Sequence, residues 1–339
     1  MRRRIRRRFD RDTGQVVEFI RGRLNIEPRH RGCVVTIGNF DGVHVGHRAV
    51  IAQLERRSRE FGRPSMVVVF EPQPQEYFRG DEAPARLSPL RDKLALLTGV
   101  GVDYLLCLRF NRALAQTSAT DFVQHLLVEA LGVHHLVVGD DFRFGHGRKG
   151  DFATLVDAGS RFGFSVEEAD TYQVGGARVS STRIRESLRA GRFEEAEAML
   201  GRPFRICGRV VHGDKRGREW GFPTANIDMV RRRPPFTGIY AVEVYGLGGS
   251  PANGVASIGV RPTVPGPAKA LLEVYLLDFD GDIYGRRIEV GFLARIRDEE
   301  RFETFDALKA QIAEDIRHVE EFFRGRSRKG DGAGRANTA

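Results

Sequence analysis

The sequence predicts a doubly wound α/β domain with a parallel, Rossmann-like sheet, followed by an antiparallel β-barrel domain that ends in a helix. From Cys33 to about Glu168, short β-branched runs alternate with segments of helical periodicity, which is the order found in a parallel sheet covered by helices. After Pro203 the chain is rich in Gly, Pro and Val, and apolar residues alternate with polar ones. This second pattern is typical of the antiparallel strands of a barrel.

The first domain is expected to contain five strands and four helices. The strand sequences are almost continuously apolar, as in strands that are buried on both faces. In the first helical segment, Val50, Ile51, Leu54 and Phe61 share one face. Ligands of such a sheet bind at the carboxyl ends of its strands. The predicted strands are residues 33–37, 65–70, 103–108, 134–139 and 163–168, and the predicted helices are residues 46–62, 88–99, 118–132 and 151–163.

A polar segment at 181–204 is expected to form two short helices between the domains. Alternating runs at 238–246, 271–279 and 288–296 predict barrel strands. The last periodic segment, 304–323, predicts an amphipathic helix with Thr304 as its N-cap. We therefore expect a basic, disordered arm over residues 1–30, a first domain over 31–200, a second domain over 204–323 and a disordered tail over 324–339.

Charge and composition exclude several classes of protein. The formal net charge is +9, but the basic residues gather in Arg2–Arg8 and in the last residues from Arg324 onward, so the body of the chain is close to neutral. We expect no specific nucleic-acid partner from charge of this kind. No apolar run reaches membrane-spanning length, and no apolar segment follows the basic N-terminus as it would in a secretory signal. The three cysteines lack zinc spacing, which favours reduced thiols in the cytoplasm. The oligomeric state is not predicted.

The segment TIGNFDGVHVGHRAV, residues 36–50, predicts an anion site. Gly38 and Gly42 allow a tight turn and the close approach of a ligand after a buried strand. A helix is expected to begin near Val45, and its free N–H groups and dipole attract an anion to which His44 and His47 also donate hydrogen bonds. A nucleoside triphosphate satisfies this arrangement. A metal pair or a simple helix cap are the alternatives, although no third metal ligand lies nearby in the sequence.

The pattern G-x-F-D-G-x-H-x-G-H resembles the signature of the H-x-G-H nucleotidyltransferases and, in its full form, the FMN adenylyltransferase branch of the bacterial FAD synthetases. A Ser/Thr-Arg segment at a helix start, here VSSTRIRESL (179–188), is the second element of that family. The resemblance implies that His44 and His47 stabilise charge during adenylyl transfer. The implied ATP-binding residues are Gly38, Asn39, Phe40, Asp41, Gly42, His44, Gly46, His47, Ser181, Thr182, Arg183 and Arg185.

Two further segments resemble the flavin side of the same family. VVGDDFRFG (137–145) implies flavin contacts by Asp141, Phe142 and Phe144. FEPQPQEYF (70–78) resembles a second loop, in which the family usually has His where this chain has Gln73. This departure affects either the acid–base chemistry of the adenylyl step or the flavin contacts.

A Gly-rich basic segment, GRVVHGDKRGREWGFPTANI (208–227), follows in the second domain. Its backbone N–H groups are suited to wrapping phosphates, but its glycines are equally compatible with a hairpin that only turns the chain. Thr224 and Asn226 offer a hydroxyl and an amide oxygen, which are hard ligands suited to Mg²⁺. The residue pattern alone does not decide between the two interpretations.

The pattern G-x-x-x-G-x-x-x-G-F-P-T-A-N resembles the nucleotide site of riboflavin kinases, and residues 253–264 and 271–290 resemble later motifs of that family. By this resemblance Glu273, a carboxylate within an apolar strand, is the base that accepts the proton of the ribityl 5′-hydroxyl. Arg297 is expected on the flavin side and Thr224 and Asn226 at Mg²⁺. The implied ATP-binding residues are Gly208, Val210, Gly213, Lys215, Gly217, Gly221, Pro223, Thr224 and Asn226.

The two resemblances together imply a bifunctional riboflavin kinase/FMN adenylyltransferase. The barrel domain is expected to convert riboflavin and ATP to FMN and ADP, and the α/β domain to join FMN to AMP from a second ATP, which gives FAD and pyrophosphate. The expected partners are these small molecules, with no membrane. Two alternatives stay open: a nucleotidyltransferase for another small phosphate with a non-catalytic β-domain, and an RNA-associated protein that uses its Arg-rich arms.

Overall fold

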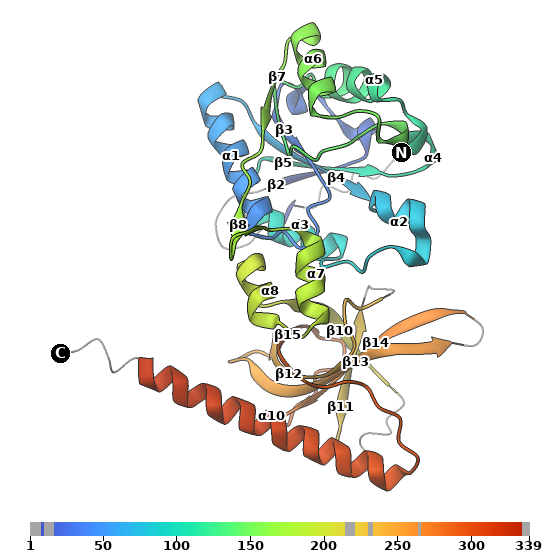
Figure 1. Cartoon of the computed structure of the whole chain (residues 1–339), viewed down its shortest axis with the longest axis vertical. Coiled ribbons are helices and arrows are strands. Elements are labelled where there is room, and N and C mark those ends of the chain that lie inside the picture. The colour runs from blue at the N-terminus through green and yellow to red at the C-terminus, as the bar shows by residue number, and fades with distance from the viewer. Residues whose placement is uncertain (1–7, 10–16, 214–220, 230–232, 264–265, 334–339) are drawn as a thin grey trace, which may run out of the picture. The chain divides into compact units, whose positions relative to one another are not determined.

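The computed structural model describes residues 8–9, 17–213, 221–229, 233–263 and 266–333 of the 339-residue chain (Figure 1). The chain divides into two compact units, which are described separately below. The first comprises Met1–Pro84 and Leu90–Ser181, and the second comprises Ala85–Pro89 and Thr182–Ala339. None of the described helices is long and apolar enough to cross a membrane.

The first unit is built on a sheet with the strand order β1-β2-β5-β4-β3-β6-β7. β1 pairs antiparallel with β2, and all other neighbours are parallel. The five strands predicted from the sequence are confirmed as β3 to β7. The strands are β1 (Arg8–Phe9), β2 (Val17–Arg21), β3 (Val34–Ile37), β4 (Ser65–Glu71), β5 (Tyr104–Arg109), β6 (His135–Val138) and β7 (Ser165–Glu168), with a separate hairpin of β8 (Gln173–Val174) and β9 (Ala177–Arg178).

Helices cover both faces of this sheet, as the prediction of a doubly wound fold requires. The residues of each strand alternate between the two faces, so that Val35 and Ile37 enter one core and Val34 enters the other. The helices are α1 (Val45–Phe61), α2 (Pro74–Arg79), α3 (Leu90–Thr98), α4 (Arg112–Gln116), α5 (Ala119–Phe122), the π-helix η4 (Val123–Ala130) and α6 (Phe152–Phe162), with short 3-10 turns η1 (Arg23–Asn25), η2 (Pro28–His30), η3 (Gly80–Glu82) and η5 (His146–Arg148).

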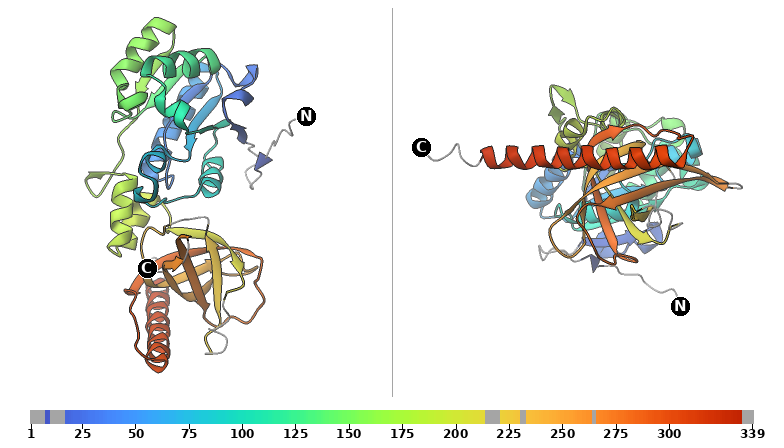
Figure 2. Two further views of the ribbon diagram at one scale, coloured as in Figure 1. Left: turned by 90° about the vertical axis from the view of Figure 1, so that its right-hand side faces the viewer. Right: turned by 90° about the horizontal axis from the view of Figure 1, so that it is seen from below.

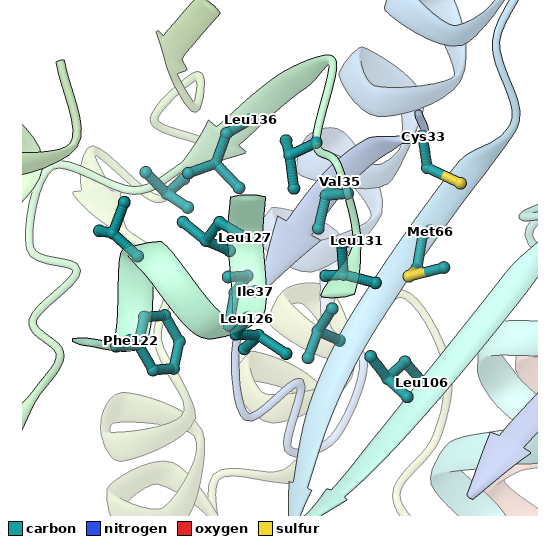
Figure 3. Packing of buried hydrophobic residues seen from close by; sticks show 14 of the residues in the cluster. Cys33, Val35, Ile37, Met66, Leu106, Phe122, Leu126, Leu127, Leu131 and Leu136 are labelled. Atoms are coloured by element: carbon teal, nitrogen blue, oxygen red, sulfur yellow. The ribbon is translucent and has the colours of Figure 1, made fainter. Parts of the chain in front are cut away.

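One core lies between the sheet and the helices α5, η4 and α6. Phe122, Leu126, Leu127 and Leu131 pack there against the sheet residues Val35, Ile37, Met66, Leu106 and Leu136 (Figure 3). The opposite core holds Ile51 and Leu54 of α1 with Leu94 and Leu97 of α3. The carboxyl ends of β3, β4, β5 and β6 therefore open into loops that are fixed by a packed core on each face of the sheet.

The expected disordered arm over residues 1–30 is wrong for its last part. Val17–Arg21 form β2, which lies parallel to β5 with Glu18 opposite Tyr104. Val17 and Ile20 are buried, so this short segment contributes apolar side chains that compensate the cost of ordering it. Residues 1–7 and 10–16, which hold most of the basic arm, lie outside the described residues.

The second unit begins with α7 (Ser181–Arg189), of which Ser181 still belongs to the first unit, and α8 (Phe193–Leu200). A closed barrel follows with the strand order β10-β11-β14-β13-β12-β15, all antiparallel (Figure 2). This confirms the predicted barrel. The strands are β10 (Arg205–Val211), β11 (Thr224–Met229), β12 (Gly238–Tyr245), β13 (Ala252–Thr263), β14 (Gly266–Leu276) and β15 (Arg287–Arg297).

The C-terminal helix α10 (Phe305–Ala333) lies along the outside of the barrel (Figure 2). Its Val319 packs against Ile239, Ala241 and Val255 of the barrel. The predicted end at Phe323 and the disordered tail from 324 onward are wrong up to Ala333. Beyond the last apolar contacts the helix continues as a charged one, with Arg324 Nη2 at 4.0 Å from Glu320 Oε2 one turn earlier. Residues 334–339 lie outside the described residues.

Candidate active sites

The loop between β3 and α1, residues 38–44, has an unusual backbone. Phe40 and Val43 adopt positive φ angles of 46° and 41°, and Gly42 has a φ of 86°. Left-handed backbone is costly for non-glycine residues, above all for a β-branched one such as Val43. Both side chains are buried in the core that the sheet shares with α1 and α3. Packing therefore holds the loop in a shape that its residues would not adopt alone, as is common at functional sites.

His44 and His47 form a stacked pair where α1 begins. His44 is the N-cap of the helix, and its Nδ1 accepts a hydrogen bond of 3.2 Å from the His47 backbone N–H. The two ring centroids are 3.6 Å apart with an angle of 15° between the planes. Because Nδ1 of His44 accepts, its ring proton lies on Nε2 when the ring is neutral. The cap therefore leaves His44 a donor for a ligand.

The environment of His47 favours its neutral form. Burial lowers the pKa of His47 well below its usual value, and the nearby charges of His44 and Lys93 lower it further. Part of the ring is accessible, but Nδ1 is shut off from solvent and has no hydrogen-bond partner among the described residues. A neutral imidazole donates one hydrogen bond, from the ring nitrogen that carries the proton.

Gly46, the second residue of α1, lies close to the ring of His44 and to the backbone of Val179. A Cβ at this position would lie 3.2 Å from His44 Nδ1 and 3.7 Å from the carbonyl oxygen of Val179. The first distance is tighter than nearly all real Cβ contacts. Because Gly46 has no side chain, the ring of His44 can lie between α1 and the segment that connects β9 to Ser181.

The residues of the Ser/Thr-Arg segment contact different parts of the chain. Ser181 Oγ donates a hydrogen bond of 2.9 Å to the carbonyl of Asp41, so the structure brings this predicted residue to the nucleotide loop. Thr182 is exposed. The two cations contact partners of the second unit. Arg183 Nη2 lies 3.2 Å from Glu195 Oε1, and the buried Arg185 donates through Nε to the Ala85 carbonyl at 2.6 Å.

The predicted flavin-side loop follows β6. Arg178 of β9 forms ion pairs with two carboxylates of this loop: its Nη1 lies 2.9 Å from Asp140 Oδ1 and its Nη2 lies 3.3 Å from Asp141 Oδ1. The rings of Phe142 and Phe144 are stacked at 5.7 Å. Phe144 is buried in the core against Phe122, while Phe142 is half-buried. Asp141 and Phe142 are therefore the accessible members of the predicted set.

A second aromatic group lies at the carboxyl ends of β4 and β5. Tyr77 and Phe78 of α2 are 39% and 66% exposed, and their ring centroids lie 5.4 and 5.7 Å from that of Phe110. Gln73, which precedes α2, is buried, and its Nε2 has no hydrogen-bond partner among the described residues. Sequence reasoning missed Phe110. Its position directly after an apolar strand was the available signal, since ligands bind at that end.

In the second unit, strand register brings the predicted kinase residues together. Asn226 of β11 lies directly opposite Glu273 of β14, and Thr224 lies opposite Tyr275. Glu273 is also opposite Ser257 of β13. Directly opposed residues share a face of the sheet and have Cβ atoms about 5 Å apart. The neighbours of these residues along the strands, Ile227, Leu272 and Val274, are buried inside the barrel. Thr224, Asn226 and Glu273 consequently share its outer face.

The Gly-rich segment 208–227, called the flap below, approaches Asn226 on this outer face. A Cβ at Gly213 would lie 2.2 Å from Nδ2 of Asn226, so any other residue here would force the Asn226 side chain to move. Gly208 is similarly close to Ile227, and Gly221 has a φ of 85°. Val210 is buried inside the barrel, and Pro223 directly precedes β11. Lys215 and Gly217 of the prediction lie outside the described residues.

Arg297 connects the end of β15 to α10. Its Nε and Nη2 donate to the two oxygens of Asp315 at 2.7 and 2.8 Å, and its Nη1 donates to the Asp298 carbonyl at 2.9 Å. Gln311 Nε2 adds a hydrogen bond of 3.1 Å to Asp315. The guanidinium is thus engaged within the fold, and its flavin contact stays a prediction.

Within the described ranges there is no group of three or more His, Cys, Asp and Glu side chains that could hold a metal ion. His44 and His47 therefore have no third ligand of these types in that part of the chain. Thr224 and Asn226 are oxygen donors of a different kind, suited to a hard cation that also binds phosphates.

Comparisons with known proteins agree with the division into two sites. Residues 26–183 match the family model described as FAD synthetase, and residues 200–323 match the model described as riboflavin kinase. A bifunctional riboflavin kinase/FMN adenylyltransferase of Pseudomonas fluorescens is 54% identical over 300 residues, which cover 88% of this chain and 96% of that protein. The protein of the same description from Escherichia coli (strain K12) is 52% identical over 308 residues, covering 91% and 98%.

A solved structure also resembles the chain over most of its length. The crystal structure of a protein titled macrolide-efflux protein from Streptococcus pneumoniae has a TM-score of 0.74 and 30% sequence identity. It covers 89% of this chain, and the match spans 98% of that protein. The likeness supports the fold of an α/β sheet followed by a closed barrel.

Proposed function

Because the chain belongs to the family of bifunctional riboflavin kinases/FMN adenylyltransferases, we propose that its two units perform two consecutive reactions at separate sites. The chain converts riboflavin to FMN with ATP, and FMN to FAD with a second ATP, releasing pyrophosphate. We assign the first reaction to the barrel, with a domain over 204–323, and the second to the α/β domain over 31–200. The observation that carries the assignment is the stacked His44/His47 pair at the start of α1.

In the adenylyl step, a phosphate oxygen of FMN attacks the α-phosphorus of ATP and pyrophosphate leaves. Negative charge grows on the phosphate oxygens, and fixed hydrogen-bond donors lower the barrier when they point at those oxygens. The N–H groups at the start of α1 and the imidazoles of His44 and His47 are such donors. Ser181 holds the loop by its bond to Asp41. No side chain forms a covalent intermediate in this scheme.

The flavin of this step is proposed to lie at the carboxyl ends of β4 and β5. The exposed rings of Tyr77 and Phe78, which pack against the half-buried ring of Phe110, offer apolar surface for an isoalloxazine. The Nε2 of Gln73, which has no hydrogen-bond partner among the described residues, is suited to donating a hydrogen bond to a flavin carbonyl or a phosphate. The 139–144 loop, with Asp141 and Phe142, closes the site from the side of β6.

In the kinase step, Glu273 accepts the proton of the ribityl 5′-hydroxyl as that oxygen attacks the γ-phosphorus. Thr224 and Asn226 are proposed to hold Mg²⁺, because they place two oxygen donors on the face that carries Glu273. When bound, Mg²⁺ neutralises the charge of the phosphates. Gly213 lets the flap approach Asn226 closely enough for its backbone N–H groups to wrap those phosphates.

The experiment that tests both assignments is incubation of the full chain with riboflavin and MgATP, followed by chromatographic separation of the flavins over time. FMN is expected to accumulate first and FAD afterwards. His47→Ala is expected to keep FMN formation and to slow FAD formation about 10²–10³-fold, because one transition-state donor is lost. Equal loss of both products in this variant argues against separate sites, and unchanged riboflavin with the parent chain contradicts the function itself.

A further inference from the structure

Lys93 is a fully buried lysine outside the motifs that mark the two sites. It lies on α3 and has no exposed surface, between Leu94 and Leu97 of the core on that side and the loop after β3. Burial of an ammonium group is costly unless it is engaged by hydrogen bonds or charges. Its Nζ donates a hydrogen bond of 2.5 Å to the carbonyl oxygen of Asn39. A residue placed at such a cost is a candidate for a specific role.

The carbonyl that Lys93 holds belongs to Asn39, directly before Phe40, Gly42 and Val43 with their positive φ angles. A second carbonyl of this loop, that of Asp41, is held by Ser181 Oγ. Side chains from two other parts of the unit therefore fix alternate carbonyls of the loop. Because the loop leads directly into the N-cap His44, its shape determines where both imidazoles point.

The charge of Lys93 also acts on His47. The titratable groups that act on His47 are the stacked His44 and Lys93, and both add to the effect of burial in lowering the pKa of His47. A buried positive charge beside the two imidazoles also favours the phosphates of a nucleotide, since a low-dielectric environment screens it little.

We propose that Lys93 is a positioning residue for adenylyl transfer: its ammonium fixes the nucleotide loop through the Asn39 carbonyl and thereby directs His44 and His47 at the triphosphate. This inference rests on the proposed role of the two histidines. It adds a residue that no motif of the sequence marked, and it makes α3 part of the nucleotide site.

The test compares Lys93→Met with Arg91→Met in the full chain. Methionine fills a similar volume without charge or donor, and Arg91 is an exposed cation on the same helix. Lys93→Met is expected to lower kcat for FAD formation from FMN and MgATP at least tenfold and to raise KM for ATP, while thermal unfolding keeps its cooperative transition. Arg91→Met is expected to stay within twofold of the parent in both constants.

A pH profile separates positioning from general damage. A positive neighbour lowers the pKa of an imidazole, so its removal raises that pKa. In Lys93→Met the acid limb of kcat for FAD formation should therefore move to higher pH, and the imidazole NMR signal of His47 in the free protein should titrate at higher pH. Arg91→Met should change neither measurement.

Lys93→Arg covers the case in which Lys93→Met does not fold. It keeps the charge but changes the donor geometry, so it should lower kcat while leaving the acid limb in place. The proposal is overturned if Lys93→Met is folded with kcat, KM for ATP and the His47 titration at parent values, or, failing that variant, if Lys93→Arg keeps the parent kcat. His47→Ala is measured in parallel. If both His47→Ala and Lys93→Met leave FAD formation intact, the proposed histidine site is wrong. If His47→Ala abolishes FAD formation and Lys93→Met does not affect it, only the role of Lys93 is refuted.

Discussion

The close contact at Gly46 predicts a substitution with opposite effects on stability and activity. Gly46 is the second residue of α1 and has no left-handed φ, so alanine fits its backbone. Alanine in a helix is more stable than glycine by about 0.8–1 kcal/mol in the interior and by less in the first turn. Judged by the helix alone, Gly46→Ala should stabilise the first unit or leave it unchanged.

The added methyl group meets the ring of His44. The new Cβ would lie 3.2 Å from Nδ1 and 3.3 Å from Cε1, so the ring must give by a few tenths of an ångström. We expect that movement to lengthen the bond of 3.2 Å that Nδ1 accepts from the His47 backbone and to misalign the stacked rings relative to the triphosphate. Loss of one aligned donor in a transition state costs about 3 kcal/mol, or about 10²-fold in kcat.

The assay measures FAD formation from supplied FMN and MgATP, with FMN formation by the other unit as an internal control and thermal unfolding as the measure of stability. Gly99→Ala is the matched control. It lies in the same unit, without a left-handed φ, and its Cβ would meet the carbonyl oxygens of Leu96 and Ala95 at the ordinary contact distances of 3.7 and 4.0 Å. If Gly46→Ala forms FAD within twofold of the parent rate, the position of His44 does not limit the reaction and the reasoning fails.

Three further outcomes are expected. Glu273→Gln keeps the size and hydrogen bonding of the side chain but accepts no proton, so FMN formation should fall about 10²–10⁴-fold while FAD formation from supplied FMN is kept; a near-parent rate of phosphorylation would remove Glu273 as the base. Asp315→Ala leaves the guanidinium of Arg297 without its partner, and urea unfolding should show the second unit destabilised by about 3 kcal/mol, the lower end for a buried pair because Arg297 is partly exposed; an unchanged midpoint refutes the anchoring of α10. Gln73→His introduces a group that titrates near neutrality, so the rate or pH profile of FAD formation should change, and if neither does, position 73 only shapes the flavin pocket.

The strands that sequence reasoning found and missed differ in one physical respect. β3 to β6 are continuous apolar runs, because both of their faces are buried, and such runs are recognised without knowledge of the neighbours. β2 contains Glu18 and Arg21 beside its two buried residues, and it follows a strongly basic segment. Its assignment depends on pairing with β5, which is more than eighty positions away in the chain for Glu18 and Tyr104. Long-range pairing of this kind leaves no local signal.

The same distinction holds for the candidate sites. His44, His47 and Gly46 are close in the sequence, so a helix start places them together and a motif is enough to find them. Asn226 and Glu273 were identified by resemblance, but only the register of β11 and β14 shows that they are directly opposed. Phe110, Lys93 and Asp315 come from other elements and carry no motif. Each of them is brought close to a site residue by packing of the fold, which the sequence pattern does not express.

One glycine in each of the two motifs, Gly46 and Gly213, has a physical reason that the sequence alone left open. In the first unit Gly46 makes room for His44, and in the second Gly213 makes room for Asn226. Neither residue has the left-handed φ that would make glycine necessary for the turn itself. In both places a side chain would collide with a polar group that is proposed to act on a nucleotide. The glycine at each position is therefore explained by close approach of the backbone to a polar side chain, rather than by flexibility, and replacing either should displace that side chain before it disturbs the fold.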